Sequence, residues 1–299
     1  MGLCQKRTYT AAQPRMTTPP KRRLRSVSAK VVRRSRGLVE RTSAGAGADV
    51  EFDPGAPALV LSPHWDDAAL SCWSVLAEPG ELNVANVFAA LPPPGRRGPW
   101  EAFAGLRDSR ERAQGRLEED ARALALAGRR AHNLELPQIQ QREGPDSVTP
   151  EDVRRALVDS VPRASRVYAP AGIGGHVDHV LARRYALGLL ERGMPVGLYA
   201  ELPYCVAHGW PSWVRADGPH GSGDVDAYWQ AFLGGVPGMP PLRDGRVARL
   251  DADTAAVKLR AIGCYELSLG LAARETLAAG AFYTAEVVWS LEARTPRAD

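Results

Sequence analysis

The chain has 299 residues, of which 44% are hydrophobic, and it carries a formal net charge of +4. This is enough apolar material for one large core, and no run approaches the roughly 18 uninterrupted apolar residues of a membrane helix. The N-terminus shows no apolar signal-peptide core after its basic residues, so a cytoplasmic protein without a membrane span is expected.

The positive charge is concentrated in the N-terminal tail. Residues 1–41 hold twelve Lys and Arg and a single acid, which leaves 26 bases and 33 acids, a net charge of −7, in the rest of the chain. Residues 1–50 are also rich in Ser, Thr and Gly and are predicted to be a disordered tail before one domain at 51–299. Basic clusters suit nucleic acid or acidic lipid. However, the tail lacks interleaved aromatics and the body is acidic, so nucleic-acid binding is not expected.

The cysteines exclude two kinds of site. The chain has four of them, and none forms a CxxC pair. This spacing argues against both a disulfide framework and a cysteine zinc site. The positions are Cys4, Cys72, Cys205 and Cys264.

Predicted strands and helices alternate along the domain. Short apolar runs bounded by turn residues predict buried strands, and helical periodicity with capping residues predicts helices. Thr149 followed by Pro150 has the chemistry of a helix start. The expected order is strand 58–61, helix 67–76, strand 82–90, helix 107–126, strand 134–136, a helix from Thr149, strand 167–169, helix 178–192, strand 196–202, helices 251–263 and 268–279, and strand 284–289. This alternation predicts a single α/β domain with a mainly parallel sheet.

A long segment, residues 207–245, is rich in Gly, Pro and Trp and has no clear periodicity. Such stretches are unusual in compact domains and often functional. Trp210, Trp213 and Trp229 either cover a sugar substrate as a lid or anchor the segment to the core, and anchoring is the favoured interpretation. The two histidines of this segment and Asp224 match no compact metal site.

Two loops carry the chemistry. One is Ser62–Asp67, and the other is Gly174–His179; each follows a predicted strand. In an open parallel sheet, ligands bind at the carboxyl ends of the strands. Three of the six histidines of the chain lie in these loops, so the two loops are expected to meet at one site.

The residue types of the two loops suit a catalytic zinc site. His64, Asp67 and His179 would supply three protein ligands and leave an open position for water, whose pKa a zinc ion lowers to about 7. Asp66 is adjacent to a ligand and suits a general base. His176 shares a helix face with His179 and would polarise the carbonyl or protonate the leaving amine.

Each motif alone is weak, because adjacent aspartates often cap helices and two histidines meet on a surface helix by chance. Their combination after two buried strands carries the prediction. Asp178 is expected to orient a metal-binding histidine without contacting the metal itself. Two imidazoles and a carboxylate suit several divalent metals, of which zinc is preferred here.

The motifs resemble those of a known family. His64-Trp65-Asp66-Asp67 resembles the HPDD signature of the LmbE-like, or PIG-L, deacetylases, and His176-Val177-Asp178-His179 resembles their HPDH motif. Supporting similarity occurs in segments 116–128, 199–204 and 258–265, and the resemblance covers about residues 57–290.

The resemblance implies a Rossmann-like three-layer fold and a zinc deacetylase acting on N-acetyl sugars. It implies His64, Asp67 and His179 as metal ligands and Asp66 as base. His176 would stabilise the oxyanion or act as acid.

The chain also departs from the family pattern. Trp65 replaces the usual Pro and is expected to change the rim of the site and not the ligands. Ala68 stands where a Glu is common, which removes a supporting hydrogen bond. Arg116 aligns with a substrate-contacting arginine of some members; the alternative is an ion pair with Glu119 or Asp120.

The expected function is therefore a zinc-dependent hydrolase that removes an acyl group, expected to be acetyl, from an amino sugar or a glycosylated small molecule. Three alternatives stay open. They are hydrolysis of a different amide on a specialised metabolite, a catalytically silent binding protein of the same fold, and a nucleic-acid or membrane role of the tail.

Overall fold

The structure is a computed structural model that describes residues 49–98, 101–102, 104–202, 209–214, 224–279 and 282–291. The chain divides into two units, Met1–Gly47 and Ala48–Asp299, and the second contains the fold described below. The predicted tail lies almost entirely outside the described residues.

A seven-stranded sheet forms the centre of the domain, in the order β4-β3-β2-β6-β7-β9-β8. Five neighbouring strands, β4, β3, β2, β6 and β7, are parallel, and β9 runs antiparallel to both β7 and β8. The bounds are β2 Ala58–Ser62, β3 Leu82–Asn86, β4 Ala131–Asn133, β6 Val167–Pro170, β7 Val196–Tyr199, β8 Arg246–Arg249 and β9 Ala285–Leu291, with a separate pair of β1 Glu51–Phe52 and β5 Arg163–Ala164. The predicted mainly parallel α/β fold is confirmed.

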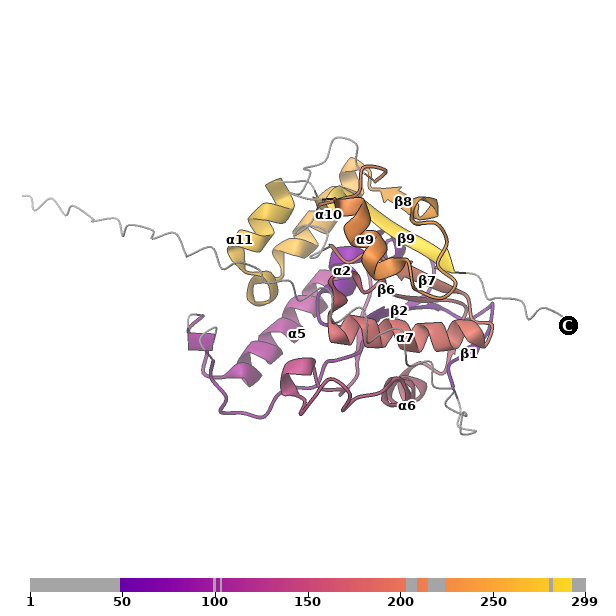
Figure 1. Cartoon of the computed structure of the whole chain (residues 1–299). Helices are drawn as coiled ribbons and strands as arrows, with labels where there is room; N and C mark the ends of the chain where they lie inside the picture. Colours follow the sequence, from indigo (N-terminus) through magenta and orange to yellow (C-terminus); the bar gives the residue numbers. More distant parts are fainter. Residues whose placement is uncertain are drawn as a thin grey trace, which may run out of the picture. The chain divides into compact units, whose positions relative to one another are not determined.

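Helices cover both faces of the sheet, which gives three layers (Figure 1). One layer is α6 Pro150–Ser160 and α7 Val177–Glu191; the other is α2 Asp67–Ser71, α3 Trp73–Leu76, α5 Ser109–Ala125, α10 Ala252–Gly263 and α11 Glu266–Ala279. Helix α9 Val225–Leu233 packs near the loop after β6. The short 3₁₀ turns are Ile139–Gln141, Ile173–Gly175, Leu242–Asp244 and Phe282–Thr284. Because helices bury both faces, the central parallel strands β2, β6 and β7 are almost continuously apolar, as the sequence pattern predicts.

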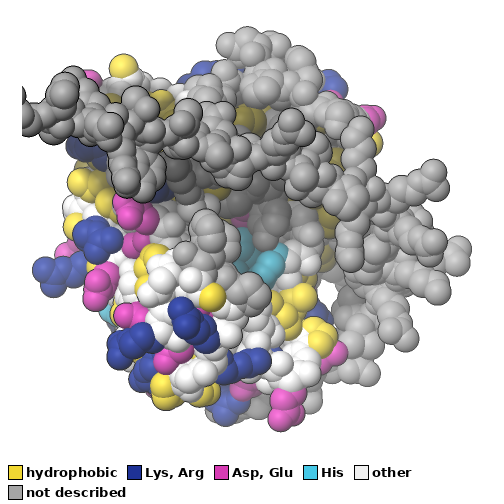
Figure 2. Space-filling model, turned by 90° about the vertical axis from the view of Figure 1, so that its left-hand side faces the viewer, with side chains coloured by type: hydrophobic (Ala, Val, Ile, Leu, Met, Phe, Trp, Pro, Cys, Tyr) yellow, Lys and Arg dark blue, Asp and Glu magenta, His cyan; other side chains and the backbone are white. Residues whose placement is uncertain are grey.

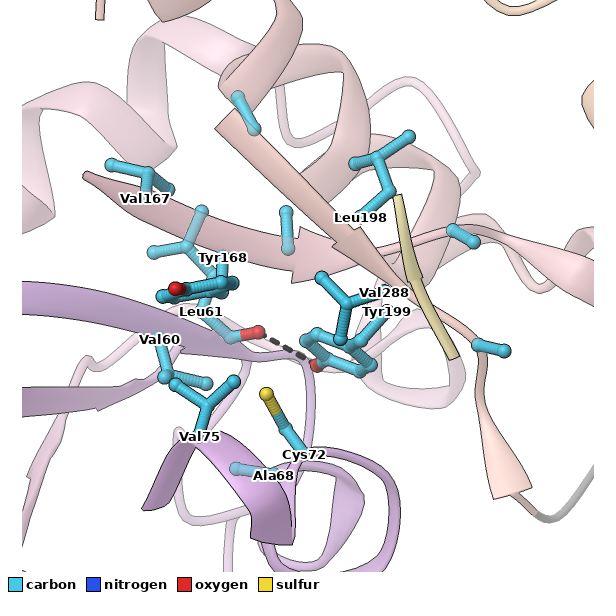
Figure 3. Packing of buried hydrophobic residues seen from close by; sticks show 14 of the residues in the cluster. Val60, Leu61, Ala68, Cys72, Val75, Val167, Tyr168, Leu198, Tyr199 and Val288 are labelled. Atoms are coloured by element: carbon cyan, nitrogen blue, oxygen red, sulfur yellow. Dashed lines mark hydrogen bonds between the residues drawn. The ribbon is translucent and has the colours of Figure 1, made fainter. Parts of the chain in front are cut away.

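The core lies between the central strands and their helices. Figure 3 shows Leu61 of β2 beside Tyr168 of β6 and Tyr199 of β7. The buried hydroxyl of Tyr199 donates a hydrogen bond to the carbonyl oxygen of Leu61 at 2.8 Å. A buried hydroxyl without such a partner would be costly, so this bond also fixes the spacing of the strands that carry the site.

The helix expected at 67–76 is in fact two helices, with the break at Cys72 (φ −131°). The cause is a distant carboxylate. The backbone N–H groups of Trp73 and Ser74 each donate to the carboxylate of Glu286 on β9 at 2.7 Å. Glu286 therefore caps a new helix start, and a partner more than 200 residues away cannot be inferred from local periodicity.

Lys258 is buried opposite this cap. It is 0% exposed, and its Nζ lies 2.5 Å from Oε1 of Glu286. Replacing Lys258 with Met is expected to lower the free energy of unfolding by about 3–5 kcal/mol, because the carboxylate stays buried without its cation. Urea unfolding followed by tryptophan fluorescence measures this. Adding Glu286→Gln should recover part of the loss, and an unchanged midpoint for Lys258→Met would contradict the account.

Three further differences concern the two edge strands, β4 and β8, and the long segment. The strand expected at 134–136 lies instead at β4, three residues earlier. Strand β8, Arg-Val-Ala-Arg, was not predicted, because it is an edge strand with exposed ends and carries no apolar alternation. Part of the segment 207–245 is helical, as α9.

The tryptophans of that segment belong to the core. Trp229 is 0% exposed and Trp210 2% exposed. The Trp229 ring centroid lies 5.8 Å from that of Trp210 and 5.8 Å from that of Trp289 on β9. These two residues therefore anchor the segment, as favoured above. His208 and His220 lie outside the described residues. Among the described residues, no helix is both long and apolar enough to cross a membrane.

Candidate active site

The two predicted loops follow β2 and β6, which are adjacent in the sheet. From β2 the chain continues to β3 on one side, and from β6 to β7 on the other. This reversal makes the gap between β2 and β6 a switch point, where open parallel sheets bind ligands. Figure 2 shows histidine side chains in a hollow of the surface.

The first loop is held by short-range hydrogen bonds. The Ser62 hydroxyl donates to the carbonyl of His64 at 2.7 Å and accepts from the N–H of Ala68 at 3.0 Å. The N–H of His64 donates to Oδ2 of Asp67 at 2.9 Å. Asp66 occupies the N-cap position of α2 but makes no capping hydrogen bond. Its carboxylate is therefore available for chemistry.

The second loop is a glycine-rich turn clamped by Glu201. Gly172 has a φ of +78°, a conformation that favours glycine. The N–H groups of Gly172 and Ile173 donate to the Glu201 carboxylate at 2.6 and 3.3 Å. The turn ends at His176, the N-cap of α7, whose Nδ1 accepts from the N–H of Asp178 at 3.3 Å.

His64, Asp67 and His179 lie together. Oδ2 of Asp67 is 3.2 Å from Nδ1 of His64 and 3.3 Å from Nε2 of His179. Metal–ligand bonds of about 2.0–2.2 Å in a tetrahedron place neighbouring ligand atoms about 3.4 Å apart. Two of the three separations within this set therefore match the spacing around one zinc-sized cation.

Each of the two histidines is also held by a second carboxylate. Nε2 of His64 lies 2.9 Å from Oδ2 of Asp178, and Nδ1 of His179 lies 3.1 Å from Oε1 of Glu201. A proton on each of these two nitrogens would leave the opposite nitrogens, Nδ1 of His64 and Nε2 of His179, to face a metal, which is the arrangement found around zinc-bound histidines. In the structure both of these opposite nitrogens lie beside Oδ2 of Asp67.

His176 offers an alternative ligand. A nitrogen of His176, one of His64 and one of His179 lie within 4.8 Å of one another, which makes a three-histidine set conceivable. Asp67 fits better, because its Oδ2 already lies at ligand spacing from both rings.

The carboxylates and imidazoles of the site shift one another's pKa values. Burial alone would lower the pKa of His179, but the carboxylates of Asp67 and Glu201 raise it to about 10. Burial would raise the pKa of Asp67, yet His179 and His64 hold it well below its usual value. Both shifts arise because the buried carboxylates and imidazoles stabilise opposite charges on one another, and a bound dication would take the place of protons on the rings.

The pKa values of the two remaining polar residues, Asp66 and His176, shift in opposite directions. Burial raises the pKa of Asp66, and the nearby Arg116 opposes this rise. Burial and the neighbouring His179 and His64 lower the pKa of His176 to about 4. His176 is therefore neutral at pH 7. Because its Nδ1 accepts from a backbone N–H, its proton resides on Nε2.

Arg116 contacts the expected base. Its Nη2 lies 3.4 Å from Oδ2 of Asp66, and its Nε donates to the Ser268 hydroxyl at 3.0 Å. The expected alternative, a pair with Glu119 or Asp120, is wrong. Glu119 instead accepts from the N–H of Leu267 at 2.6 Å, and Asp120 from Asn86 and Tyr265.

The expectation for Trp65 also fails. Its side chain is 1% exposed, so it is not at the rim. Its indole N–H donates to Asn133 at 3.1 Å, and the Arg116 guanidinium lies 5.5 Å from its ring centroid. The Trp65 ring therefore packs against the Arg116 guanidinium in a cation–π contact.

Replacing Arg116 with Met tests whether this residue orients Asp66 or binds the substrate. If Arg116 mainly orients Asp66, kcat is expected to fall about tenfold or more with little change in KM. If it mainly binds substrate, KM is expected to rise instead. Steady-state kinetics with zinc-saturated protein distinguishes them, and unchanged values of both constants would contradict either role.

Two residues of the site were missed by the sequence reasoning. Glu201 follows β7, the next strand along the same sheet edge, but the strand expected at 196–202 contained it, so the rule that located the other two loops did not reach it. Arg142, whose Nη2 lies 2.7 Å from Oδ1 of Asp178, comes from a segment with no distinguishing pattern.

Comparison with known proteins gives the relationship. No protein-family model matches the chain. The chain is 34% identical over 160 residues to a 2'-N-acetylparomamine deacetylase of Streptomyces fradiae, a match that covers 49% of this chain and 57% of the relative. It is 29% identical over 189 residues to the protein of the same name from Niallia circulans, covering 50% of this chain and 68% of the relative. Over about half of its length, the chain is therefore similar in sequence to two deacetylases of acetylated paromamine.

The fold agrees with this relationship. A deacetylase of the teicoplanin biosynthetic pathway superposes with a TM-score of 0.61 at 22% identity, over 81% of this chain and 100% of that chain. The chain spans just over half the length of the first curated relative. The two sequence relatives confirm the resemblance to deacetylases that the two motifs indicated.

Proposed function

We propose that this protein is a zinc-dependent N-deacetylase that acts on an acetylated amino sugar or a glycosylated small molecule. The observation that carries the proposal is the meeting of His64, Asp67 and His179 at ligand spacing beside a spare carboxylate, Asp66. The names of the two related proteins, 2'-N-acetylparomamine deacetylases, support an acetylated amino sugar as the substrate.

His64 Nδ1, Asp67 Oδ2 and His179 Nε2 would hold the metal. A zinc ion there supplies a Lewis acid that polarises an amide carbonyl and makes water acidic enough to attack near neutral pH. Asp178 and Glu201 keep the two imidazoles in the tautomer that binds a cation. Asp67 is itself fixed by the N–H of His64, so the three donors are arranged before the metal arrives.

Asp66 takes the proton of the attacking water. Its carboxylate makes no helix-capping bond and is anchored by Arg116, so it is free to accept while held in one place. When the C–N bond breaks, Asp66 returns the proton to the amine nitrogen. The products are acetate and a free amine.

His176 donates a hydrogen bond to the amide oxygen as negative charge develops on it. Its neutral ring with a proton on Nε2 suits a donor, a stabilisation of about 3–4 kcal/mol for one well-placed group. The pKa of about 4 disfavours the other expected role, proton delivery by an imidazolium.

The test is a deacylation screen. The full chain, loaded with one equivalent of Zn²⁺, is incubated with 2'-N-acetylparomamine, simpler N-acetylated sugars, glycosylated metabolites and amides with longer acyl chains. The expected result is one acetate released per free amine formed from an acetylated sugar. Release from longer acyl amides alone would move the substrate to a different amide. No release from any of them by the zinc-loaded protein would overturn the proposal.

A further inference from the structure

A buried arginine lies behind one of the metal-facing histidines. The side chain of Arg142 is 0% exposed, as is that of Asp178, and its Nη2 lies 2.7 Å from Asp178 Oδ1. Burying a guanidinium costs several kcal/mol unless a carboxylate compensates for it. Such a residue close to the site therefore calls for an explanation beyond surface charge.

One oxygen of Asp178 is hydrogen-bonded, and the other lies in an ion pair that lacks hydrogen-bond geometry. Oδ2 lies 2.9 Å from Nε2 of His64 and accepts from the N–H of Ile139 at 3.2 Å, and Oδ1 faces Arg142. The carboxylate plane is thus defined from two sides. Arg142 is the contact that holds the side of the carboxylate facing away from the histidine.

Arg142 is itself held in place. Its Nε donates to the carbonyl of Pro137 at 2.8 Å, and its guanidinium lies 4.6 Å from the ring centroid of Phe88. The Phe88 ring in turn lies 6.4 Å from that of His64. A planar guanidinium suits both the stacking and the carboxylate, whereas the point charge of lysine suits only the latter.

We propose that Arg142 is a positioning residue of the metal site. It fixes the Asp178 carboxylate so that Oδ2 receives the Nε2 proton of His64, which directs Nδ1 of His64 toward the cation. This inference rests on the proposed function, because it takes His64 as a ligand. Without Arg142, the carboxylate loses its partner on Oδ1 and can rotate away from His64.

The experiment measures zinc affinity. The dissociation constant for Zn²⁺ is obtained by competition with a chromophoric chelator for the full chain and for Arg142→Met. The expected result is affinity weakened about 10- to 100-fold, as for other residues that support metal-binding histidines. Arg142→Lys keeps the cation and is expected to recover part of the loss. Arg142→Gln takes the place of the Met variant if that variant does not fold.

Arg129→Met is the matched control. This arginine donates to the carbonyls of Leu76, Glu78 and Gly80 and is in hydrogen-bond contact with no residue of the site. Its loss is expected to lower the melting temperature and leave zinc affinity unchanged. A merely structural role for Arg142 would give the same result.

A double substitution tests whether Arg142 acts through Asp178. In an Asp178→Asn background, Arg142→Met is expected to weaken zinc binding less than about twofold further. An equal loss in both backgrounds, or unchanged zinc affinity for Arg142→Met, would overturn the inference. Failure of the unsubstituted chain to bind zinc would instead overturn the proposed function.

Discussion

Replacing Asp66 with Asn is expected to lower the deacetylation rate constant by about 10²- to 10⁴-fold while zinc binding is retained, because the amide cannot accept the proton of the attacking water. The Asn side chain has nearly the same shape, so the loop and helix α2 should be unchanged. Asp66 contacts Arg116 through a single oxygen at 3.4 Å and makes no capping bond, so the substitution removes little structural support.

The comparison is made at saturating zinc with the acetylated sugar that the screen identifies. Asp251→Asn provides the control, because Asp251 is an exposed aspartate that caps α10, and it should keep full turnover. Equal turnover in Asp66→Asn and the unsubstituted protein, at equal zinc content, would refute a general-base role for Asp66.

Replacing Asp67 with Ala is expected to weaken zinc binding by more than about 100-fold, beyond the loss typical of residues that only support a ligand. Activity at low micromolar zinc should disappear with it. Oδ2 of Asp67 lies between the two ligand nitrogens and also accepts from the N–H of His64, so its loss removes a donor and loosens the loop. Competition with a chelator gives the affinity.

His176→Ala is the informative partner of this variant. If Asp67 is the third ligand, His176→Ala keeps zinc but loses turnover. Zinc affinity that survives in Asp67→Ala and fails in His176→Ala would identify the three-histidine set instead.

The parts of the site that local sequence could predict are those that follow strands. Ser62–Asp67 and Gly174–His179 were placed together because each follows an apolar run and parallel strands end at one edge. Glu201 was missed because the expected strand 196–202 extended beyond the end of β7 at Tyr199 and so contained this residue. What the sequence could not supply is which carboxylate faces which ring, because that depends on side-chain packing across the sheet.

Other features depend on partners distant in sequence. The break at Cys72 arises because the N–H of Trp73 donates to the carboxylate of Glu286. These two residues are 213 positions apart in the sequence. For Arg116, a substrate contact was predicted with an ion pair on its own helix as the alternative, yet its partners in the structure are Asp66 and Ser268. Arg142 carries no local signal at all, because its role comes from burial beside Asp178. Edge strand β8 was not predicted, because an exposed strand lacks the apolar alternation by which strands are recognised.

The most direct test of the account is anomalous diffraction at the zinc edge from crystals of the zinc-loaded protein. The account predicts one strong peak about 2.0–2.2 Å from Nδ1 of His64, Oδ2 of Asp67 and Nε2 of His179. A peak bound elsewhere, or no peak between these three atoms in crystals that contain zinc, would contradict it.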